Sequence, residues 1–207
     1  MTGKQLKDSI LQWAIQGKLV SQDPSDEPAK ILLERIRKEK NRLIKEKKIK
    51  KPKTDSVIYR DTDGSFYEKL SDGKVNCIDD EIPFEIPESW EWVRLSSIAS
   101  IMGGKRIPAG KKLITTDTGH IYIRVADMKN ESVNTDDLHY ISDEIYEKIK
   151  RYTISKDDIY ITVAGTIGNV GTIPETLDGA NLTENADKIV FSLISKEYLL
   201  RVLQSPT

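Results

Sequence analysis

The hydrophobic pattern of the chain changes its period near residue 52, so the two sides of that point are expected to fold differently. Before it, apolar residues recur at steps of three and four, as on one face of a helix. After it, short runs alternate apolar and polar residues, as in half-buried strands. Pro52 and Lys53 are expected to close the helical part. The sequence therefore predicts a helical region followed by one that contains β-sheet.

The first fifty residues are expected to form two helices. In the first, over residues 4–18, one stripe needs a partner to bury it, and it carries Leu6, Ile10, Trp13, Ala14 and Gly17. Asp26 is expected to cap the second helix, with Glu27 and Pro28 in its first turn. That helix is predicted to run to about Lys50.

The second helix has a narrow apolar seam surrounded by basic residues. The seam carries Ala29, Leu32, Leu33, Ile36, Leu43 and Ile44. So little apolar surface favours a helical hairpin or a coiled coil over a globular core. The basic side chains could contact phosphates, but a charge run on a helix more often forms a solvated face. The sequence alone leaves both interpretations open.

A small three-stranded β-meander is predicted after the helices. Three short runs of strand-forming residues occur at 57–59, 66–67 and 75–78. They are separated by Asp63-Gly64 and Asp72-Gly73, dipeptides that supply the positive φ angles of tight hairpin turns.

The rest of the chain mixes strands and helices without regular alternation, which predicts an α+β fold and not a doubly wound sheet. An aromatic-rich strand over Trp90–Leu95 is expected to begin this domain. Further strands are predicted at Ile121–Ala126, Ile159–Ala164 and Lys188–Leu193. One helix is expected to be capped by Ser142, with Tyr146 and Ile149 facing the core. A final helix is predicted to begin near Ser195.

Composition excludes several classes of protein. The 207 residues include 32 basic and 33 acidic ones, so a net charge of −1 gives no global attraction to a polyanion. Any binding of nucleic acid must therefore come from local charge asymmetry. Cys77 is the only cysteine, which excludes an internal disulfide and fits a reducing, cytoplasmic location. No apolar run is long enough to predict a membrane span.

No catalytic or metal site is indicated. His120 and His139 have no second ligand at metal-binding spacing, and Asp157 and Asp158 are typical of a turn. The glycine-rich stretch 165–171 lacks the lysine and hydroxyl pair of a phosphate-binding loop, so a strand-turn-strand is predicted there. We therefore expect no enzymatic activity and no bound cofactor.

Two groups of motifs resemble the specificity subunits of type I restriction-modification enzymes. The helical conserved region of that family is matched at residues 6–20, 22–24, 26–29 and 32–36. The entry into a target recognition domain is matched at residues 82–83, 86–90 and 92–95. Weaker landmarks of such a domain are Gly103-Gly104, Pro108, 123–128, 158–161, Gly165 and Gly168. The resemblance is strong to about Leu95 and looser after it.

The resemblance implies three regions and a set of partners. The regions are a helical spacer at 1–53, a β-meander linker at 54–81 and a target recognition domain at 82–207. The family usually continues beyond this domain, so the chain is expected to be cut short at its end. Partners would be double-stranded DNA, modification subunits that use S-adenosylmethionine, a restriction subunit that uses ATP, and a second copy of the chain. The residues expected to contact partner subunits are Leu6, Ile10, Trp13, Leu32, Ile36 and Leu43.

Independently of the resemblance, residues 103–112 form the most DNA-like segment, because they combine cations with glycines and contain no acid. The full set of expected DNA-binding residues is Lys105, Arg106, Lys111, Lys112, Arg124, Lys129, Thr166, Asn169, Asn181, Thr183 and Asn185. Acids cluster instead around Glu131 to Glu147, which suggests that this face points away from DNA.

The sequence supports a second hypothesis of another class. The chain could be a helix-mediated interaction protein, or a regulatory fragment, that docks on the modification subunit without reading DNA. The basic loop would then be an ordinary flexible surface segment.

Overall fold

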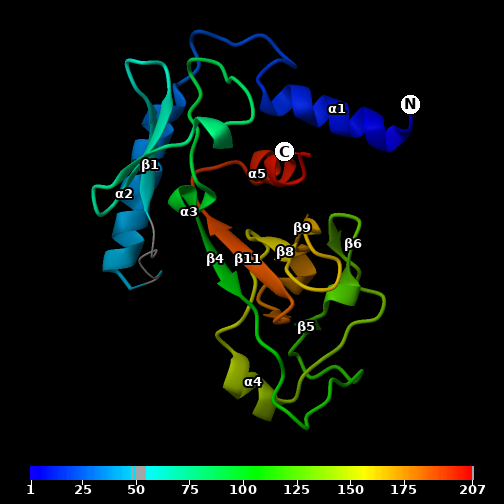
Figure 1. Ribbon diagram of the computed structural model, residues 1–207. Coiled ribbons are helices and arrows are strands. Elements are labelled where there is room, and N and C mark those ends of the chain that lie inside the picture. The colour runs from blue at the N-terminus through cyan, green and yellow to red at the C-terminus, as the bar shows by residue number, and fades with distance from the viewer. Residues whose placement is uncertain (48, 50–54, 207) are drawn as a thin grey trace. The chain divides into compact units, whose positions relative to one another are not determined.

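A computed structural model describes residues 1–47, 49 and 55–206 (Figure 1). These residues form two compact units. Unit 1 comprises residues 1–100 and 192–207, and unit 2 comprises residues 101–191. Helices and mostly antiparallel sheets occur together, which confirms the predicted α+β class. The predicted region boundaries after residues 53 and 81 remain predictions, and the predicted helix-closing pair Pro52 and Lys53 lies outside the described residues.

Unit 1 begins with the two predicted helices. Its elements are α1 (Gly3–Ile15), α2 (Ala29–Lys45), β1 (Ser56–Arg60), β2 (Phe66–Leu70), β3 (Val75–Cys77), η1 (Asp79–Glu81), α3 (Leu95–Ile98) and α5 (Lys196–Leu203). Thr2 caps α1 through a capping box with Gln5. Helix α1 has close contacts with α5, and α2 has close contacts with α3, so each helix of the predicted hairpin contacts another helix of the unit.

The prediction for the start of α2 was wrong. Pro28 and not Asp26 occupies the cap position, and no side chain caps the helix. The amide of Ala29 donates to the carbonyl oxygen of Ser89 at 2.8 Å, so a distant segment supplies the partner that a capping carboxylate would have offered. The helix ends at Lys45 and not near residue 50.

The predicted meander is confirmed. The sheet has the order β1-β2-β3 with antiparallel pairs, and Gly64 and Gly73 take φ angles of 88° and 90° in its two turns. On the inner face, the buried carboxylate of Glu68 accepts hydrogen bonds from Arg94 at 2.7 Å and from the Ser56 hydroxyl at 2.6 Å. The Arg94 guanidinium also donates to Glu81 at 2.7 Å, which ties the 94–98 segment to the meander.

The strand predicted over Trp90–Leu95 is absent: this stretch is irregular and leads into α3. The Trp92 ring lies 5.1 Å from the Phe84 ring, and Arg94 is held by Glu68 and Glu81. These side-chain contacts outweigh the strand propensity of the aromatic residues, because propensity reflects fit to a sheet and no strand of the part of the chain that the structure describes pairs with this stretch.

Unit 2 is built on a four-stranded sheet with the order β4-β11-β8-β9. Its elements, with β4 at the boundary, are β4 (Ala99–Gly103), β5 (Tyr122–Ile123), η2 (Val125–Asp127), β6 (Met128–Lys129), β7 (Ser132–Val133), α4 (Asp143–Ile149), β8 (Ile159–Thr162), β9 (Val170–Thr172), η3 (Glu175–Leu177), β10 (Asn181–Leu182) and β11 (Ala186–Phe191). The short strands β5 and β10 pair in parallel, and β6 and β7 form a hairpin. A core cluster joins them and includes Ile123, Ile154, Tyr160, Leu177 and Leu182.

The strand predicted from Ile121 extends only over β5. Arg124 and Asp127 close a single helical turn, in which the Arg124 amide donates to the Asp127 carboxylate at 2.8 Å, and this turn ends the strand. Helix α4 follows Ser142 as predicted, although the Ser142 side chain makes no capping bond. Its buried residues are Ile145 and Ile149, whereas Tyr146 is only partly buried.

Acid unfolding tests the inner face of the meander. Hydrogen bonds from Arg94 and then Ser56 lower the pKa of Glu68 to about 2. A depressed folded-state pKa stabilises the fold above the ordinary value near 4.5, and this stabilisation disappears as the pH falls through 2. Glu68→Gln should therefore lower the free energy of unfolding by about 2 kcal/mol at pH 7. This loss of stability should become smaller as the pH falls from 4.5 to 2.

Urea unfolding followed by tryptophan fluorescence measures this pH dependence. Glu85→Gln is the control, since the Glu85 side chain is 73% exposed. If the free energy of unfolding changes equally with pH in Glu68→Gln and in the unsubstituted protein between pH 4.5 and 2, Glu68 is not the group whose lowered pKa stabilises the fold.

A second prediction concerns Gly104 in unit 2. A Cβ atom at this position would lie 2.1 Å from the Thr183 carbonyl oxygen and 2.4 Å from that of Leu182, so the backbone would have to move. Gly104→Ala should lower the free energy of unfolding by about 2 to 3 kcal/mol. Gly103→Ala is the matched control, because the nearest atom to its Cβ would be a side-chain oxygen of Asp187 at 3.3 Å. If the two variants unfold at similar urea concentrations, residue 104 does not lie so close to the carbonyl oxygens of Leu182 and Thr183.

Candidate nucleic-acid interface

The basic segment, residues 104–112, is fixed at its start to the turn between β10 and β11. The Gly104 amide donates to the carbonyl oxygen of Ala186 at 3.1 Å, and the Lys105 amide donates to that of Leu182 at 2.8 Å. The Tyr122 hydroxyl also donates to the Lys105 carbonyl oxygen at 2.9 Å. The first residues of the segment therefore have a defined position on unit 2.

Arg106 is exposed, but it is paired with an acid that the sequence analysis missed. Its side chain is 75% exposed, and its Nε donates to the Glu184 carboxylate at 2.6 Å. This hydrogen bond raises the pKa of Arg106. Burial acts to raise the pKa of Glu184, but hydrogen bonds from Arg106, from its own amide and from Thr183 lower it overall. Glu184 and Arg106 thus form an ionised pair at neutral pH.

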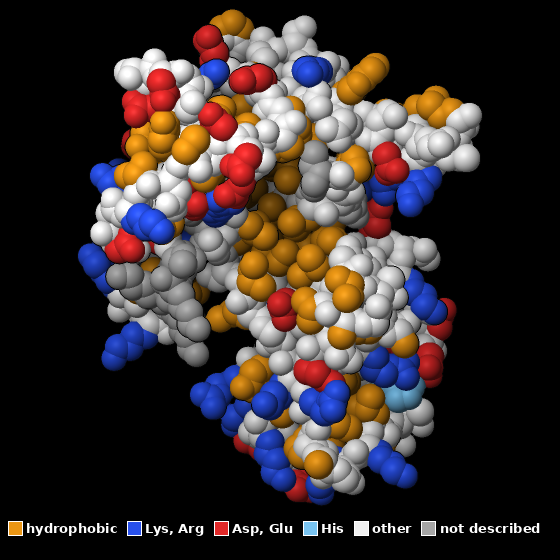
Figure 2. Space-filling view, viewed as in Figure 1, with side chains coloured by type: hydrophobic (Ala, Val, Ile, Leu, Met, Phe, Trp, Pro, Cys, Tyr) orange, Lys and Arg blue, Asp and Glu red, His pale blue; other side chains and the backbone are white. Residues whose placement is uncertain are grey.

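The other cations of the basic segment are also exposed. Lys105 Nζ lies 5.7 Å from the centre of the Tyr152 ring, and Lys111 Nζ donates to Glu144 at 2.6 Å. Hydrogen bonds from Lys111 and Lys148 lower the pKa of Glu144 to about 2. Figure 2 shows Lys and Arg side chains over the part of unit 2 that carries α4 and the β4–β5 connection, with acidic side chains among them. The expectation that the acids around residues 131–147 lie apart from the basic segment was therefore wrong for Glu144.

The glycine-rich stretch forms the predicted strand-turn-strand between β8 and β9. Thr166 is exposed in this turn. Asn169 is half-buried, and its side-chain amide donates to the Met128 carbonyl oxygen at 2.9 Å. The turn is joined to the β10–β11 turn, because the Val163 amide donates to the Asn185 carbonyl oxygen at 2.9 Å.

Two of the expected DNA-binding residues lie inside unit 2. Asn181 is 1% exposed, and its amide group donates to the Ile149 carbonyl oxygen at 3.0 Å. Thr183 is 5% exposed, and its hydroxyl donates to Glu184 at 3.1 Å. Their burial excludes direct contact with DNA in this conformation. The sequence could not separate them from Asn185, which is half-buried in the same turn, because all three are polar residues before a strand.

Of the two cations expected around the end of the β5 strand, Arg124 is held by acids of unit 2, whereas Lys129 is exposed. The Arg124 guanidinium bonds to the buried carboxylate of Asp127 at 2.5 Å and to Asp137 at 3.1 Å, so it stabilises the turn after β5. Its pKa is raised, chiefly by the Asp127 carboxylate. Lys129, by contrast, is exposed on β6. The exposed members of the predicted set are thus Lys105, Arg106, Lys111, Lys112, Lys129 and Thr166.

The residues expected to bind partner subunits lie in unit 1 and fall into two groups. On α1, Leu6, Ile10 and Trp13 are 46%, 44% and 59% exposed, so these three residues of the predicted stripe are open to solvent, whereas Ala14 and Gly17 are half-buried. On α2, Ile36 is 3% exposed, and Leu32 and Leu43 are half-buried, so this seam contributes mainly to the interior of the unit. Burial therefore removes Ile36 from any surface for partners.

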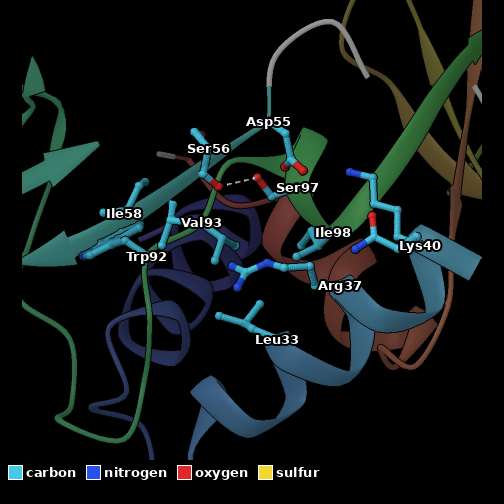
Figure 3. Close-up of a pocket in the computed structure, with 12 residues that line it drawn as sticks. Leu33, Arg37, Lys40, Asp55, Ser56, Ile58, Trp92, Val93, Ser97 and Ile98 are labelled. Carbon is cyan, nitrogen blue, oxygen red and sulfur yellow. Dashed lines mark hydrogen bonds between the residues drawn. The ribbon is translucent and has the colours of Figure 1, made fainter. Parts of the chain in front are cut away.

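A small cavity in unit 1 has mixed polar and apolar walls. Side chains of α2, β1 and the 92–98 segment face one another across it (Figure 3). Trp92 Nε1 is buried there and has no hydrogen-bond partner among the described residues. Lys40 donates to the Ser96 carbonyl oxygen, and burial lowers its pKa. A volume of about 40 Å³ holds a few water molecules and is far too small for a nucleotide.

Among residues 1–47, 49 and 55–206, no group of three or more His, Cys, Asp or Glu side chains is arranged to hold a metal ion. In the same residues, no helix combines the length and the apolar character of a membrane span.

Comparison with protein families matches residues 87–204 to the type I restriction modification DNA specificity domain. Two proteins of Escherichia coli are similar in sequence. The chain is 39% identical to the EcoAI type I restriction enzyme specificity subunit over 166 residues, which are 80% of this chain and 24% of that protein. It is 45% identical to the EcoEI specificity subunit over 98 residues, which are 47% of this chain and 13% of that protein. The chain thus spans about a quarter or less of the length of these relatives.

Solved structures give a weaker likeness. The HsdS subunit of Thermoanaerobacter tengcongensis has a TM-score of 0.46 and 16% identity, over 58% of this chain and 28% of that one. A chain from a structure of type I R-M complex assembly and conformational transition has a TM-score of 0.47 and 17% identity, over 59% and 29% of the two chains. Family membership rests instead on the domain match, which covers more than half of the residues. The chain therefore belongs to the family of type I restriction modification DNA specificity domains.

Proposed function

We propose that this chain recognises a DNA sequence as part of the specificity subunit of a type I restriction-modification complex, and that it performs no chemistry itself. One observation carries the proposal: the specificity-domain match covers residues 87–204, which are more than half of the chain, and it includes the exposed basic segment of unit 2. In the complex, partner subunits would methylate and cleave the DNA that this chain selects.

The proposed DNA-binding surface consists of the basic segment, the β8–β9 turn and the β10–β11 turn. Backbone hydrogen bonds join these three segments, from Lys105 to Leu182 and from Val163 to Asn185. Lysines on such a surface position the phosphate backbone, and an arginine can bond to O6 and N7 of guanine. Arg106 is therefore the best candidate for a residue that reads a base.

The ion pairs of Arg106 and Lys111 are compatible with this role. Exposed ion pairs typically contribute only about 0.2 to 1 kcal/mol, so phosphate or guanine can replace the acid at little cost. Glu184 is 27% exposed and could itself accept a hydrogen bond from N4 of cytosine. Before DNA binds, Glu184 would hold the Arg106 guanidinium in one orientation.

Partners and cofactors are part of the proposal. Modification subunits would dock on unit 1, where the α1 stripe is open, and a restriction subunit would join through the assembled complex. S-adenosylmethionine and ATP would belong to these partners. One specificity domain makes few base contacts, so a second domain or a second copy of the chain would complete the DNA site. A cytoplasmic location follows from a DNA ligand and from the lone Cys77.

The alternative function is an interaction protein that docks on the modification subunit without reading DNA. The open apolar stripe on α1 and the acids beside Arg106 and Lys111 are the observations that favour it. The two functions differ in what the cations of unit 2 do when DNA is present, so the salt dependence of binding separates them.

Replacing the cations of the basic segment should reduce the salt dependence of DNA binding. Lys105→Ala, Arg106→Ala and Lys112→Ala each remove one candidate phosphate or base contact. Each lost phosphate contact should flatten the plot of log affinity against log salt concentration by about 0.9. The measurement is fluorescence anisotropy of a labelled duplex with the specificity protein and its modification subunit, between 50 and 200 mM salt.

Arg35→Ala is the control for these variants, since Arg35 is an exposed arginine of unit 1. The proposed function predicts an unchanged slope for this control. Unchanged slopes for all three variants of the basic segment would favour the interaction protein instead.

A second prediction tests docking through α1. Leu6→Ala and Trp13→Ala should each weaken binding to the modification subunit by about 1 to 3 kcal/mol, because buried anchors dominate protein interfaces. Isothermal titration calorimetry gives the affinity. Ile31→Ala is the control, since Ile31 is 45% exposed on α2. If Trp13→Ala and Ile31→Ala bind as tightly as the unsubstituted protein, α1 is not the docking surface.

A further inference from the structure

The most exposed large apolar side chain of unit 2 among the described residues belongs to Ile167, at the tip of the β8–β9 turn. It is 76% exposed, and Val163 at the start of the same turn is 44% exposed. Burying an isoleucine is worth about 2 kcal/mol, and no neighbour of Ile167 provides that burial. Single exposed apolar residues are common, so the exposure becomes informative only through the position of the residue.

The turn holds Ile167 in a defined conformation. The hydroxyl of Thr162, which is 1% exposed, donates to the Thr166 carbonyl oxygen and accepts from the Asn169 amide at 3.0 Å. The Gly168 amide donates to the Thr162 carbonyl oxygen at 2.9 Å, and Gly165 and Gly168 take the positive φ angles that the turn requires. These bonds hold the backbone on both sides of Ile167, whose side chain is therefore presented to solvent in a fixed turn.

The same turn is hydrogen-bonded to the β10–β11 turn, which binds Arg106. The amides of Val163 and Ala164 both donate to the Asn185 carbonyl oxygen, at 2.9 and 3.3 Å. Glu184, the neighbour of Asn185, binds Arg106. Ile167 thus lies on the proposed DNA-binding surface, within a stretch, residues 163–170, that carries no charge.

We infer that Ile167 contacts the 5-methyl group of a thymine in the major groove. This inference rests on the proposed function and adds the class of base that the turn reads. The thymine methyl is the one apolar group on the base edges of the major groove, and cations and hydroxyls do not distinguish it. Isoleucine suits this contact because its β-branched side chain is stiff and loses little freedom on binding.

The test replaces single thymines by deoxyuridine, which lacks only the 5-methyl group. The complete specificity protein with its modification subunits first selects a sequence from a randomised duplex pool. Duplexes of that sequence then carry deoxyuridine at one thymine position at a time, and their affinities are measured for the unsubstituted complex, Ile167→Ala and Ile167→Val. Ile101→Ala is the control, since Ile101 is 51% exposed elsewhere in unit 2.

The inference predicts one thymine at which deoxyuridine weakens binding about fourfold, as expected for the loss of one buried methyl group. Ile167→Ala should bind the thymine and deoxyuridine duplexes equally, whereas Ile167→Val and Ile101→Ala should keep the discrimination. Thermal unfolding checks that each variant folds, which is expected because both side chains are exposed.

Two results would overturn the inference. One is that no deoxyuridine substitution weakens binding by the unsubstituted complex; an equal loss of affinity of Ile167→Ala for both duplexes would then indicate a side chain inserted between base pairs. The other is that Ile167→Ala keeps the discrimination. In each case the proposed function stands if the unsubstituted complex enriches a sequence; if it enriches none, the proposed function itself fails.

Discussion

Two backbone hydrogen bonds, from Gly104 to Ala186 and from Lys105 to Leu182, fix the position of the basic segment on unit 2. They require residue 104 to be glycine, since a Cβ atom there would lie 2.1 Å from the Thr183 carbonyl oxygen. Because the backbone is held so closely, Arg106 reaches Glu184 on the adjoining turn. The β8–β9 turn joins the same region through Asn185, so the proposed surface depends on this contact.

The polar residues around this contact fall into two groups: the buried ones stabilise the turns, and the exposed ones are available to bind DNA. The buried side chains of Asn181 and Thr183 donate to the Ile149 carbonyl oxygen and to Glu184, and Arg124 neutralises the buried carboxylate of Asp127. A buried donor or acceptor without a partner is costly, so these side chains stabilise the turns. Thr183 bonds to Glu184, which holds the exposed Arg106, and the buried hydroxyl of Thr162 donates to the Thr166 carbonyl oxygen in the β8–β9 turn. The buried polar residues therefore give the exposed ones their positions.

Local patterns predicted much of the fold. The period-two runs and Asp-Gly dipeptides located the meander, and the final helix begins directly after Ser195, near which it was predicted. The failures arose where a distant residue supplied the partner. Ser89 replaced the expected Asp26 cap, and side-chain contacts of Trp92 and Arg94 replaced a strand. Such contacts join residues far apart in sequence, so no local pattern reports them.

The candidate site was predictable to a similar degree. Local composition identified the basic segment, because its cations and glycines are adjacent in sequence. It could not reveal Glu184 or Glu144, which approach from 78 and 33 residues away along the chain. Nor could it separate the exposed Thr166 from the buried Thr183, since both are polar residues in turns. Ile167 was within the glycine-rich stretch but carried no signal of its own until its exposure was known.

The most direct test of the account is amide hydrogen–deuterium exchange of the specificity protein in complex with its modification subunits, with and without a selected duplex. The account predicts that DNA slows exchange in three segments of unit 2, residues 104–112, 163–169 and 183–185, and that a duplex of scrambled sequence protects them less. Protection confined to unit 1, or equal protection by both duplexes, would contradict the claim that unit 2 reads DNA.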